Sequence, residues 1–220
     1  MSEKQQPAGN ADTIARECTR FQALCTRGEL GADVATAILR YSPADIRQMM
    51  QNFGNKIRDI TPDYRERLKE KVTEHLLGTY QAARLMKQQG SFGPLKEPVT
   101  RNEQHYWDMV RDQCVSEGGG DKPRLRFLKF LLAGFTMIVR REPGHAAGTP
   151  FPGGDEVQLI DGICYCPVRD KANDVGGALC PYCPARQTPE IGYLRPPVNA
   201  SEHKKQEFID NCYRHHNFNG

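Results

Sequence analysis

The stretch Phe130–Val139, FLLAGFTMIV, is the longest apolar run in the chain and the one around which a core must form. As a helix, this run rises only about 15 Å, roughly half the hydrocarbon thickness of a bilayer. Pro123 upstream is a favourable first residue for a helix. Apolar residues then follow at spacings of three and four: Leu125, Leu128, Leu132, Phe135 and Val139. The pattern predicts a buried core helix over 123–139 and not a membrane span.

Basic residues surround this helix. Arg124, Arg126 and Lys129 precede the apolar run, and Arg140 and Arg141 follow it. Such a stripe could bind an acidic partner, but it is more often the solvated ends and outer face of a core helix. We therefore expect these side chains to face solvent.

Start and stop signals predict further helices upstream. Ser42-Pro43 and Thr61-Pro62 each place an N-cap residue before a proline at the first helical position. Thr100-x-x-Glu103 is a capping box, and Gly90 is a stop for the long helix that begins at Pro62. The first helix, over 12–27, places four residues on one buried face: Ile14, Cys18, Phe21 and Cys25. Only a short segment, around 34–41, is expected between this helix and Ser42.

The composition excludes several classes of protein. The 220 residues are 38% hydrophobic and 26% charged, and the net charge of +3 is too close to neutral to predict binding to nucleic acid or to a membrane surface. The polar start, Met1–Asn10, lacks the apolar segment of a secretory signal. We expect a cytoplasmic protein, in which clustered cysteines are metal ligands or redox groups and not disulfides.

The amino-acid composition of the chain changes at Glu142. Residues 142–154 contain four glycines and three prolines, too many for a helix. A β-hairpin with a type I′ turn is indicated further along the chain. Its strands are Val157–Ile160 and Ile163–Cys166, and Asp161-Gly162 forms the turn. Ser201 can cap a closing helix whose apolar side is Phe208, Ile209, Cys212 and Tyr213.

These signals together predict a mainly α fold in four parts. The N-terminus is expected to be disordered over 1–11, and an α-helical bundle forms the body over 12–141. A small module over 142–200 holds the Gly/Pro-rich loop, the β-hairpin and a cysteine-rich metal site. A C-terminal helix over 201–220 packs on the body.

Four of the eight cysteines are candidate metal ligands. Cys164, Cys166, Cys180 and Cys183 form the pattern C-x-C-x13-C-x2-C, two thiol pairs joined by a short loop. Two such pairs suit a tetrahedral ion, and zinc is the first choice. Residues 142–200 contain too few large apolar side chains for a core of their own, so a bound ion worth on the order of 10 kcal/mol of folding free energy would stabilise them.

Several alternatives stay open at this site. His145 or Cys212 could replace Cys164 as the fourth ligand, and an iron–sulfur cluster could replace zinc, because three of these cysteines precede proline. Cys180-Pro-Tyr-Cys183 also resembles a dithiol redox motif, but that chemistry needs a following helix, which the sequence after Pro184 does not predict. No Ser-His-Asp or H-E-x-x-H arrangement is present, so no catalytic residue is proposed.

The C-terminal motifs carry a family resemblance. Three stretches of the chain resemble an uncharacterised protein family of methanogenic archaea, domain of unknown function 2115. They are Pro143-Gly-His145 with Gly148–Gly154, Tyr165–Val168, and Ala178–Cys183. The resemblance covers about residues 140–190. It implies an anaerobic, cytoplasmic context, in which Cys166, Cys180 and Cys183 match recurring cysteines and Cys164 often has no counterpart. It implies no activity, since the family has none established.

The expected function follows from the closed ligand set and the missing catalytic constellation. We expect a non-catalytic, metal-binding accessory or interaction protein with a protein partner, of the kind that serves as an assembly factor in methanogen metabolism. The alternative is an iron–sulfur protein that transfers electrons. An enzyme would require three protein ligands and an open coordination position.

Overall fold

A computed structural model describes residues 11–115, 121–152, 154–171 and 177–189 of the chain. The predicted disorder of residues 1–10, the predicted closing helix over 201–220 and the candidate ligand Cys212 lie outside these ranges. Ala11, placed in the disordered segment by the sequence, is the first residue of a helix.

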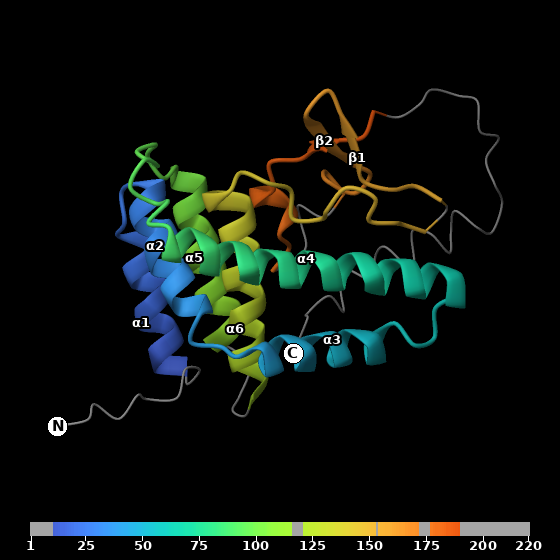
Figure 1. Cartoon of the computed structure of the whole chain (residues 1–220), viewed down its shortest axis with the longest axis horizontal. Coiled ribbons are helices and arrows are strands. Elements are labelled where there is room, and N and C mark those ends of the chain that lie inside the picture. The colour runs from blue at the N-terminus through green and yellow to red at the C-terminus, as the bar shows by residue number, and fades with distance from the viewer. Residues whose placement is uncertain (1–10, 116–120, 153, 172–176, 190–220) are drawn as a thin grey trace.

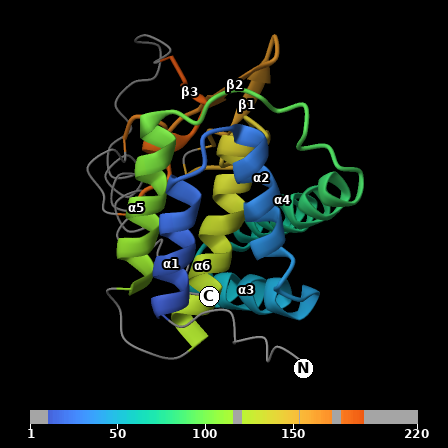
Figure 2. The same ribbon diagram turned by 90° about the vertical axis from the view of Figure 1, so that its left-hand side faces the viewer.

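The described residues are mainly helical (Figure 1). Helices α1, α2, α5 and α6 stand side by side, and the small sheet lies at one end of them (Figure 2). The α-helices are α1 Ala11–Gln22, α2 Arg27–Ile38, α3 Pro43–Lys56, α4 Pro62–Gln88, α5 Arg101–Val115 and α6 Asp121–Gly134. The last continues into η1, a π-helix over Phe135–Val139. The C-terminal region holds β1 Gln158–Ile160, β2 Ile163–Cys166, the 3-10 helix η2 Cys180–Tyr182 and β3 Arg186–Gln187.

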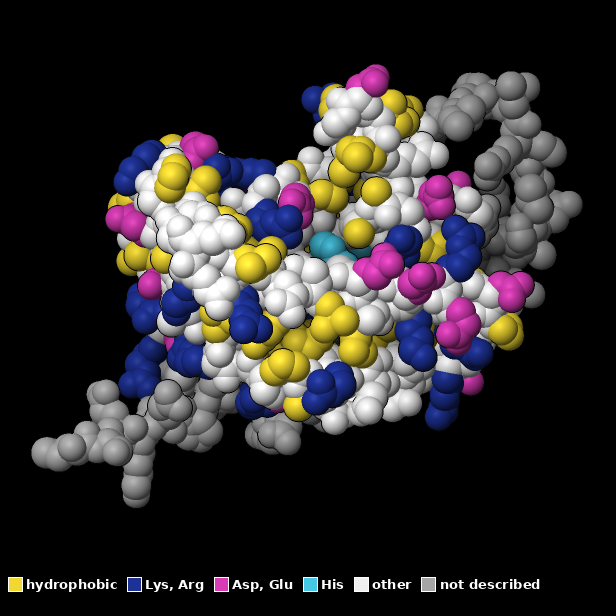
Figure 3. Space-filling view, in the orientation of Figure 1, with side chains coloured by type: hydrophobic (Ala, Val, Ile, Leu, Met, Phe, Trp, Pro, Cys, Tyr) yellow, Lys and Arg dark blue, Asp and Glu magenta, His cyan; other side chains and the backbone are white. Residues whose placement is uncertain are grey.

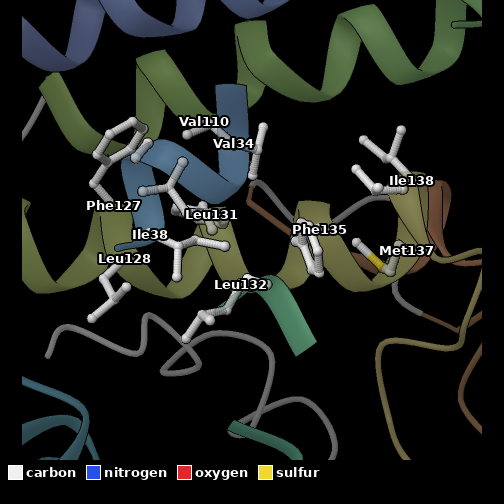
Figure 4. Close-up of a cluster of buried hydrophobic side chains, with 14 of the residues drawn as sticks. Val34, Ile38, Val110, Phe127, Leu128, Leu131, Leu132, Phe135, Met137 and Ile138 are labelled. Atoms are coloured by element: carbon white, nitrogen blue, oxygen red, sulfur yellow. The ribbon is translucent and has the colours of Figure 1, made fainter. Parts of the chain in front are cut away.

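The predicted core helix is confirmed and lies at the centre of the body. Figure 4 shows side chains of α6 and η1, among them Leu128, Leu131 and Phe135, packed with Val34 and Ile38 of α2 and Val110 of α5. All of η1 is buried. None of the described helices is long and apolar enough to cross a membrane.

The sequence did not predict the change from α-helix to π-helix. The backbone N–H of Arg140 donates to the carbonyl of Phe135, five residues back, at 3.0 Å. Thr136, in the widened turn, shares a buried hydroxyl hydrogen bond of 3.0 Å with Thr79 of α4. Single π-turns of this kind are frequent at functional sites.

Two predictions at the N-terminal end were wrong. Helix α1 ends at Gln22, so the periodicity does not reach Cys25, which is exposed, whereas Cys18 is buried as expected. The segment expected to be short is a full helix, α2. Its start signal is a second capping box, in which Thr26 and Glu29 exchange hydrogen bonds. That signal was present in the sequence.

The predicted signals of the next helices are largely confirmed. Capping boxes form at Ser42 and at Thr100, although the Thr61 side chain makes no cap hydrogen bond. Helix α4 ends at Gln88, and Gly90, just beyond the C-cap residue Gln89, has a φ of 65°. The backbone N–H groups of Gly90 and Ser91 donate to the carbonyls of Lys87 and Met86, which is the Schellman pattern.

The expectation that the basic stripe faces solvent holds for Arg141 but was wrong for Arg126 and Lys129. Arg126 is only 1% exposed, and its Nη1 donates to the Gln113 carbonyl at 2.7 Å. Lys129 is buried with its Nζ 4.5 Å from the centre of the Phe130 ring. Arg126 places its guanidinium beside a carbonyl of α5, and Lys129 places its amino group beside the Phe130 ring, so charge alone did not predict exposure.

The predicted β-hairpin is confirmed, with Asp161 and Gly162 both at positive φ, as a type I′ turn requires. The short parallel strand β3 beside β2 was not predicted. Buried residues of this region, including Val157, Val168 and Ala185, belong to the same hydrophobic cluster as the helical body. The C-terminal module therefore completes its core by packing on the helices.

Gly28 of α2 tests how tightly the 92–97 loop packs on that helix. A Cβ at Gly28 would lie 2.3 Å from the Phe92 carbonyl oxygen and 2.8 Å from that of Leu95. Gly28→Ala should lower the free energy of unfolding by about 2–3 kcal/mol or more, because backbone must move. The control is Gly78→Ala at an exposed position of α4, where an added Cβ meets nothing within 4 Å. Because alanine has the higher helix propensity, this substitution should raise the free energy of unfolding by about 0.5–1 kcal/mol. Urea denaturation measures both, and equal effects would contradict the packing.

Asp45 links α3 to α6 and gives a pH-dependent test. Arg124 donates to both carboxylate oxygens, at 2.7 and 2.9 Å, and this bonding holds the pKa of Asp45 below its ordinary value. A lowered folded pKa means that the stabilisation is present above the unfolded pKa and is lost as pH falls through the folded one. Asp45→Asn should cost about 1–3 kcal/mol at pH 7, and the cost should shrink towards pH 2.

The matched control is Asp59→Asn, because Asp59 pairs with Arg58 at the surface, where both side chains are mostly exposed. That substitution should change the free energy of unfolding little at any pH. A cost of Asp45→Asn that stays constant down to pH 2 would show that charge is not the cause.

Candidate metal centre

Two similar turns bring three of the predicted cysteines into the module. Cys166-Pro-Val-Arg169 and Cys180-Pro-Tyr-Cys183 both begin with Cys-Pro. In each, the backbone N–H of the fourth residue donates to the carbonyl of the first, at 3.3 and 3.0 Å. The second turn supplies a cysteine at both ends, whereas the first ends in Arg169. The Arg169 Nε donates to the Cys183 carbonyl at 3.0 Å and joins the two turns.

The three sulfur-bearing residues of these turns face inward. Cys166, Cys180 and Cys183 are 3%, 5% and 9% exposed. Burial raises the pKa of the Cys166 thiol to about 12; the Val168 N–H, hydrogen-bonded to it, acts in the opposite direction, and the neighbouring Cys180 and Cys183 raise it further. The backbone N–H of Gly144 donates to the Cys183 sulfur at 3.3 Å. N–H donors aimed at buried sulfurs stabilise thiolates.

His145 lies beside these cysteines, on the loop that follows the π-helix. Its Nδ1 is 3.9 Å from the Cys166 sulfur, and its ring packs edge-on against Phe151. Burial, and then the neighbouring His75, lower the pKa of His145 to about 4. The imidazole is therefore neutral near pH 7, which is the protonation state that a metal requires.

The path of the chain into His145 is held by a partly buried ion pair. Arg141 has a φ of 59°, an uncommon value for a residue other than glycine, and turns the chain out of η1. Its guanidinium pairs with Glu103, a buried residue that also caps α5. Backbone strain held by its surroundings is a common feature of functional sites. Here it occurs four residues before His145.

Cys164 stands apart from the two turns. It lies on β2 opposite Leu159 of the hairpin and is only partly buried. Burial, the Cys183 thiol and the Glu142 carboxylate all raise its pKa. Across the part of the chain that the structure describes, no group of three or more His, Cys, Asp or Glu side chains is arranged to hold a metal ion as placed.

Helix α4 borders this region with a row of polar residues that the sequence did not mark as part of the site. The Tyr64 hydroxyl donates to the Pro150 carbonyl at 3.1 Å, and Arg67 pairs with Glu156 at 3.3 Å. Further along the helix, the side chain of Lys71 borders Gly148. The next members are His75 and Thr79. Spacings of three, four, four and four place all five on one face, which is the signal that could have found His75.

The dithiol reading of Cys180–Cys183 does not match the local fold. Such thiols are activated at the N-terminus of an α-helix. Here Cys180–Tyr182 forms a three-residue 3-10 helix, Cys183 is extended, and the following element is the strand β3.

Comparison with other proteins places the chain among methanogen sequences. It is 52% identical over 62 residues to a UPF0305 protein of Methanothermobacter thermautotrophicus, which is 26% of this chain and 40% of the relative. It is 39% identical over 71 residues to a UPF0305 protein of Methanopyrus kandleri, 32% of this chain and 50% of the relative. The matched stretches thus span half or less of the length of these relatives. No solved structure matches.

A family match covers most of the described chain. Residues 26–188, from the start of α2 to the end of the sheet, match one archaeal family. The match includes both Cys-Pro turns, the His145 loop and the α4 row. The chain belongs to the family described as an uncharacterized protein conserved in archaea, DUF2115.

Proposed function

We propose that this chain is a non-catalytic, metal-binding accessory protein of the methanogen cytoplasm, in which Cys166, Cys180 and Cys183 hold one structural ion. Zinc is the ion that best suits a buried set of thiol ligands. The observation that carries the proposal is the pair of Cys-Pro turns, joined by Arg169, with buried sulfurs that accept backbone N–H donors.

The need for an ion follows from the small size of the module. Its strands contain three, four and two residues, too few to be stable alone. Among the described residues between Cys166 and Cys183, the regular structure consists of the two turns and one 3-10 helix. An ion that joins the two turns would add to the stabilisation that the module gains from packing on the helices.

The residues fit a metal by the chemistry of their donors. The high pKa of Cys166 means that its sulfur is a thiol until a cation displaces the proton, so binding would release protons. Forming the metal site requires rotation of these side chains, since no three donor side chains of the described residues surround a common centre. A change between staggered rotamers moves a cysteine sulfur by about 3 Å, which leaves the backbone of both turns in position.

An iron–sulfur cluster is the second candidate for the same ligands. Each of the three buried cysteines precedes a proline, as in some ferredoxin-type ligand runs. Under this reading the protein would transfer electrons. A brown protein with visible charge-transfer absorption after anaerobic purification would select the cluster, and a colourless protein with one equivalent of zinc would select the structural site.

The exposed end of the hairpin supports a protein partner. Leu159 and Ile160 are 60% and 49% exposed. Figure 3 shows hydrophobic side chains on the hairpin, which projects at the top of the molecule. A bound ion would hold β2, and with it this apolar tip, in one orientation. A fixed surface for a partner is the role we propose for the site, within a larger assembly of methanogen metabolism.

Cys180→Ser tests the metal centre. It should reduce the bound metal from one ion per chain to well below one, because an alcohol is a poor zinc ligand, and it should loosen the module while the helices stay folded. Metal analysis of anaerobically purified protein and far-UV circular dichroism measure the two effects.

Cys18→Ala is the control, because Cys18 is a buried cysteine of α1 outside the module. It should leave the metal content unchanged, although it removes a core sulfur. Loss of metal in Cys18→Ala, or an unmodified protein that binds no metal at all, would contradict the proposed function.

A further inference from the structure

Resting on the proposed metal centre, we propose that His145, through Nδ1, is the fourth ligand in place of Cys164, and that His75 of α4 is a positioning residue that orients the His145 ring. The centre is then of the Cys3His type. It joins the two Cys-Pro turns to the loop that leaves the π-helix.

The first argument comes from the unequal turns. In a site built from two similar turns, each turn supplies a ligand from its first and fourth positions. The second turn does so with Cys180 and Cys183, but the first has Arg169 at its fourth position. The Arg169 Nε is bonded to the Cys183 carbonyl, so this residue holds the turns together and does not bind a cation. The fourth donor must therefore come from outside both turns.

The second argument is the distance between the donors. Metal–sulfur and metal–nitrogen bonds of about 2.3 and 2.0–2.1 Å at a tetrahedral angle place the two donor atoms about 3.6 Å apart. The Cys166 sulfur and His145 Nδ1 are 3.9 Å apart, which is long for a hydrogen bond but close to this value. The preceding residue, Gly144, donates its N–H to the Cys183 sulfur at 3.3 Å. One short segment thus contacts a cysteine of each turn.

Cys164 is a weaker ligand on geometry and charge. It lies two residues before Cys166 on β2, outside both turns and opposite exposed Leu159. A neutral imidazole at His145 adds a donor without adding charge beside the other sulfurs.

His75 is placed beside His145 by the register of α4 along the loop. Lys71, one turn earlier, borders Gly148, and Thr79, one turn later, bonds to Thr136 of η1. His75 lies between these contacts and therefore opposite the segment 137–147, which includes His145. A histidine that binds a metal through one ring nitrogen needs a partner for the other, and such partners fix the orientation of the ring. His75 is the side chain that α4 places to serve His145 in this way.

The experiment compares zinc affinity and the Co²⁺ spectrum among variants of the full chain. Cys164→Ser should keep one ion per chain, with unchanged zinc affinity and an unchanged Co²⁺ spectrum. His145→Ala should weaken zinc binding by more than about 100-fold, because a ligand is lost. His145→Cys should restore binding with an added thiolate-to-cobalt charge-transfer contribution, which a purely structural role of His145 would not produce.

His75 is tested by a pair of variants. His75→Leu should weaken zinc binding by about 10–100-fold, as loss of an outer partner of a ligand does, with an unchanged Co²⁺ spectrum and an unchanged melting temperature of the zinc-free protein. His75→Gln, which keeps a hydrogen-bonding group, should recover most of the affinity. Equal affinities for His75→Leu and the unmodified chain would overturn the positioning role.

The outcomes separate this inference from the proposed function. If the unmodified chain binds one ion and Cys180→Ser loses it, the proposed function stands. If Cys164→Ser then loses the ion and His145→Ala retains it, the fourth ligand is Cys164 and the inference is wrong. If the unmodified chain binds neither zinc nor cobalt, the proposed function itself fails.

Discussion

The structure depends on the burial of one helix from every side. Helix α6 and its continuation η1 lie between α2, α4 and α5, and the C-terminal module covers the end that the helices leave open. Met137, near the end of η1, lies 3.1 Å from the Cβ position of Gly144. The helical body and the module therefore share a single hydrophobic core. The orientation in which the chain leaves η1 decides where the candidate metal centre is built.

Much of the fold could be predicted from local signals because those signals are the interactions themselves. Ser42 with Asp45 and Thr100 with Glu103 form the hydrogen bonds that their spacing predicts, and Asp161-Gly162 adopts the φ values of its turn. The exposure of the charged residues could not be predicted in this way. The burial of Arg126 depends on a carbonyl of α5, which is distant in sequence and has no local signature.

In the candidate site, too, some features could be predicted from local sequence signals and others depend on packing between distant residues. The cysteine spacing drew attention to Cys166, Cys180 and Cys183, which the structure buries in two turns marked by Pro167 and Pro181. The unequal roles of Cys164 and Arg169 depend on register: Cys164 lies on a strand, and Arg169 occupies the position where a fourth cysteine would complete the pattern. His75 was missed because His145, which it neighbours, lies about 70 residues away in the sequence, and only packing brings the two close together.

The widened turn at Phe135–Val139 has a consequence for how the chain tolerates changes in length. A π-helix holds one more residue per turn than the regular helix that it interrupts. Deleting one residue there would therefore let α6 continue in regular geometry with little rotation of the residues that follow. Arg141 would stay directed toward Glu103, whereas deleting a residue from the regular part of α6 would rotate Arg141 by about 100° around the helix axis and direct the His145 loop past the cysteines. The widened turn can thus lose one residue, whereas the regular part of α6 cannot.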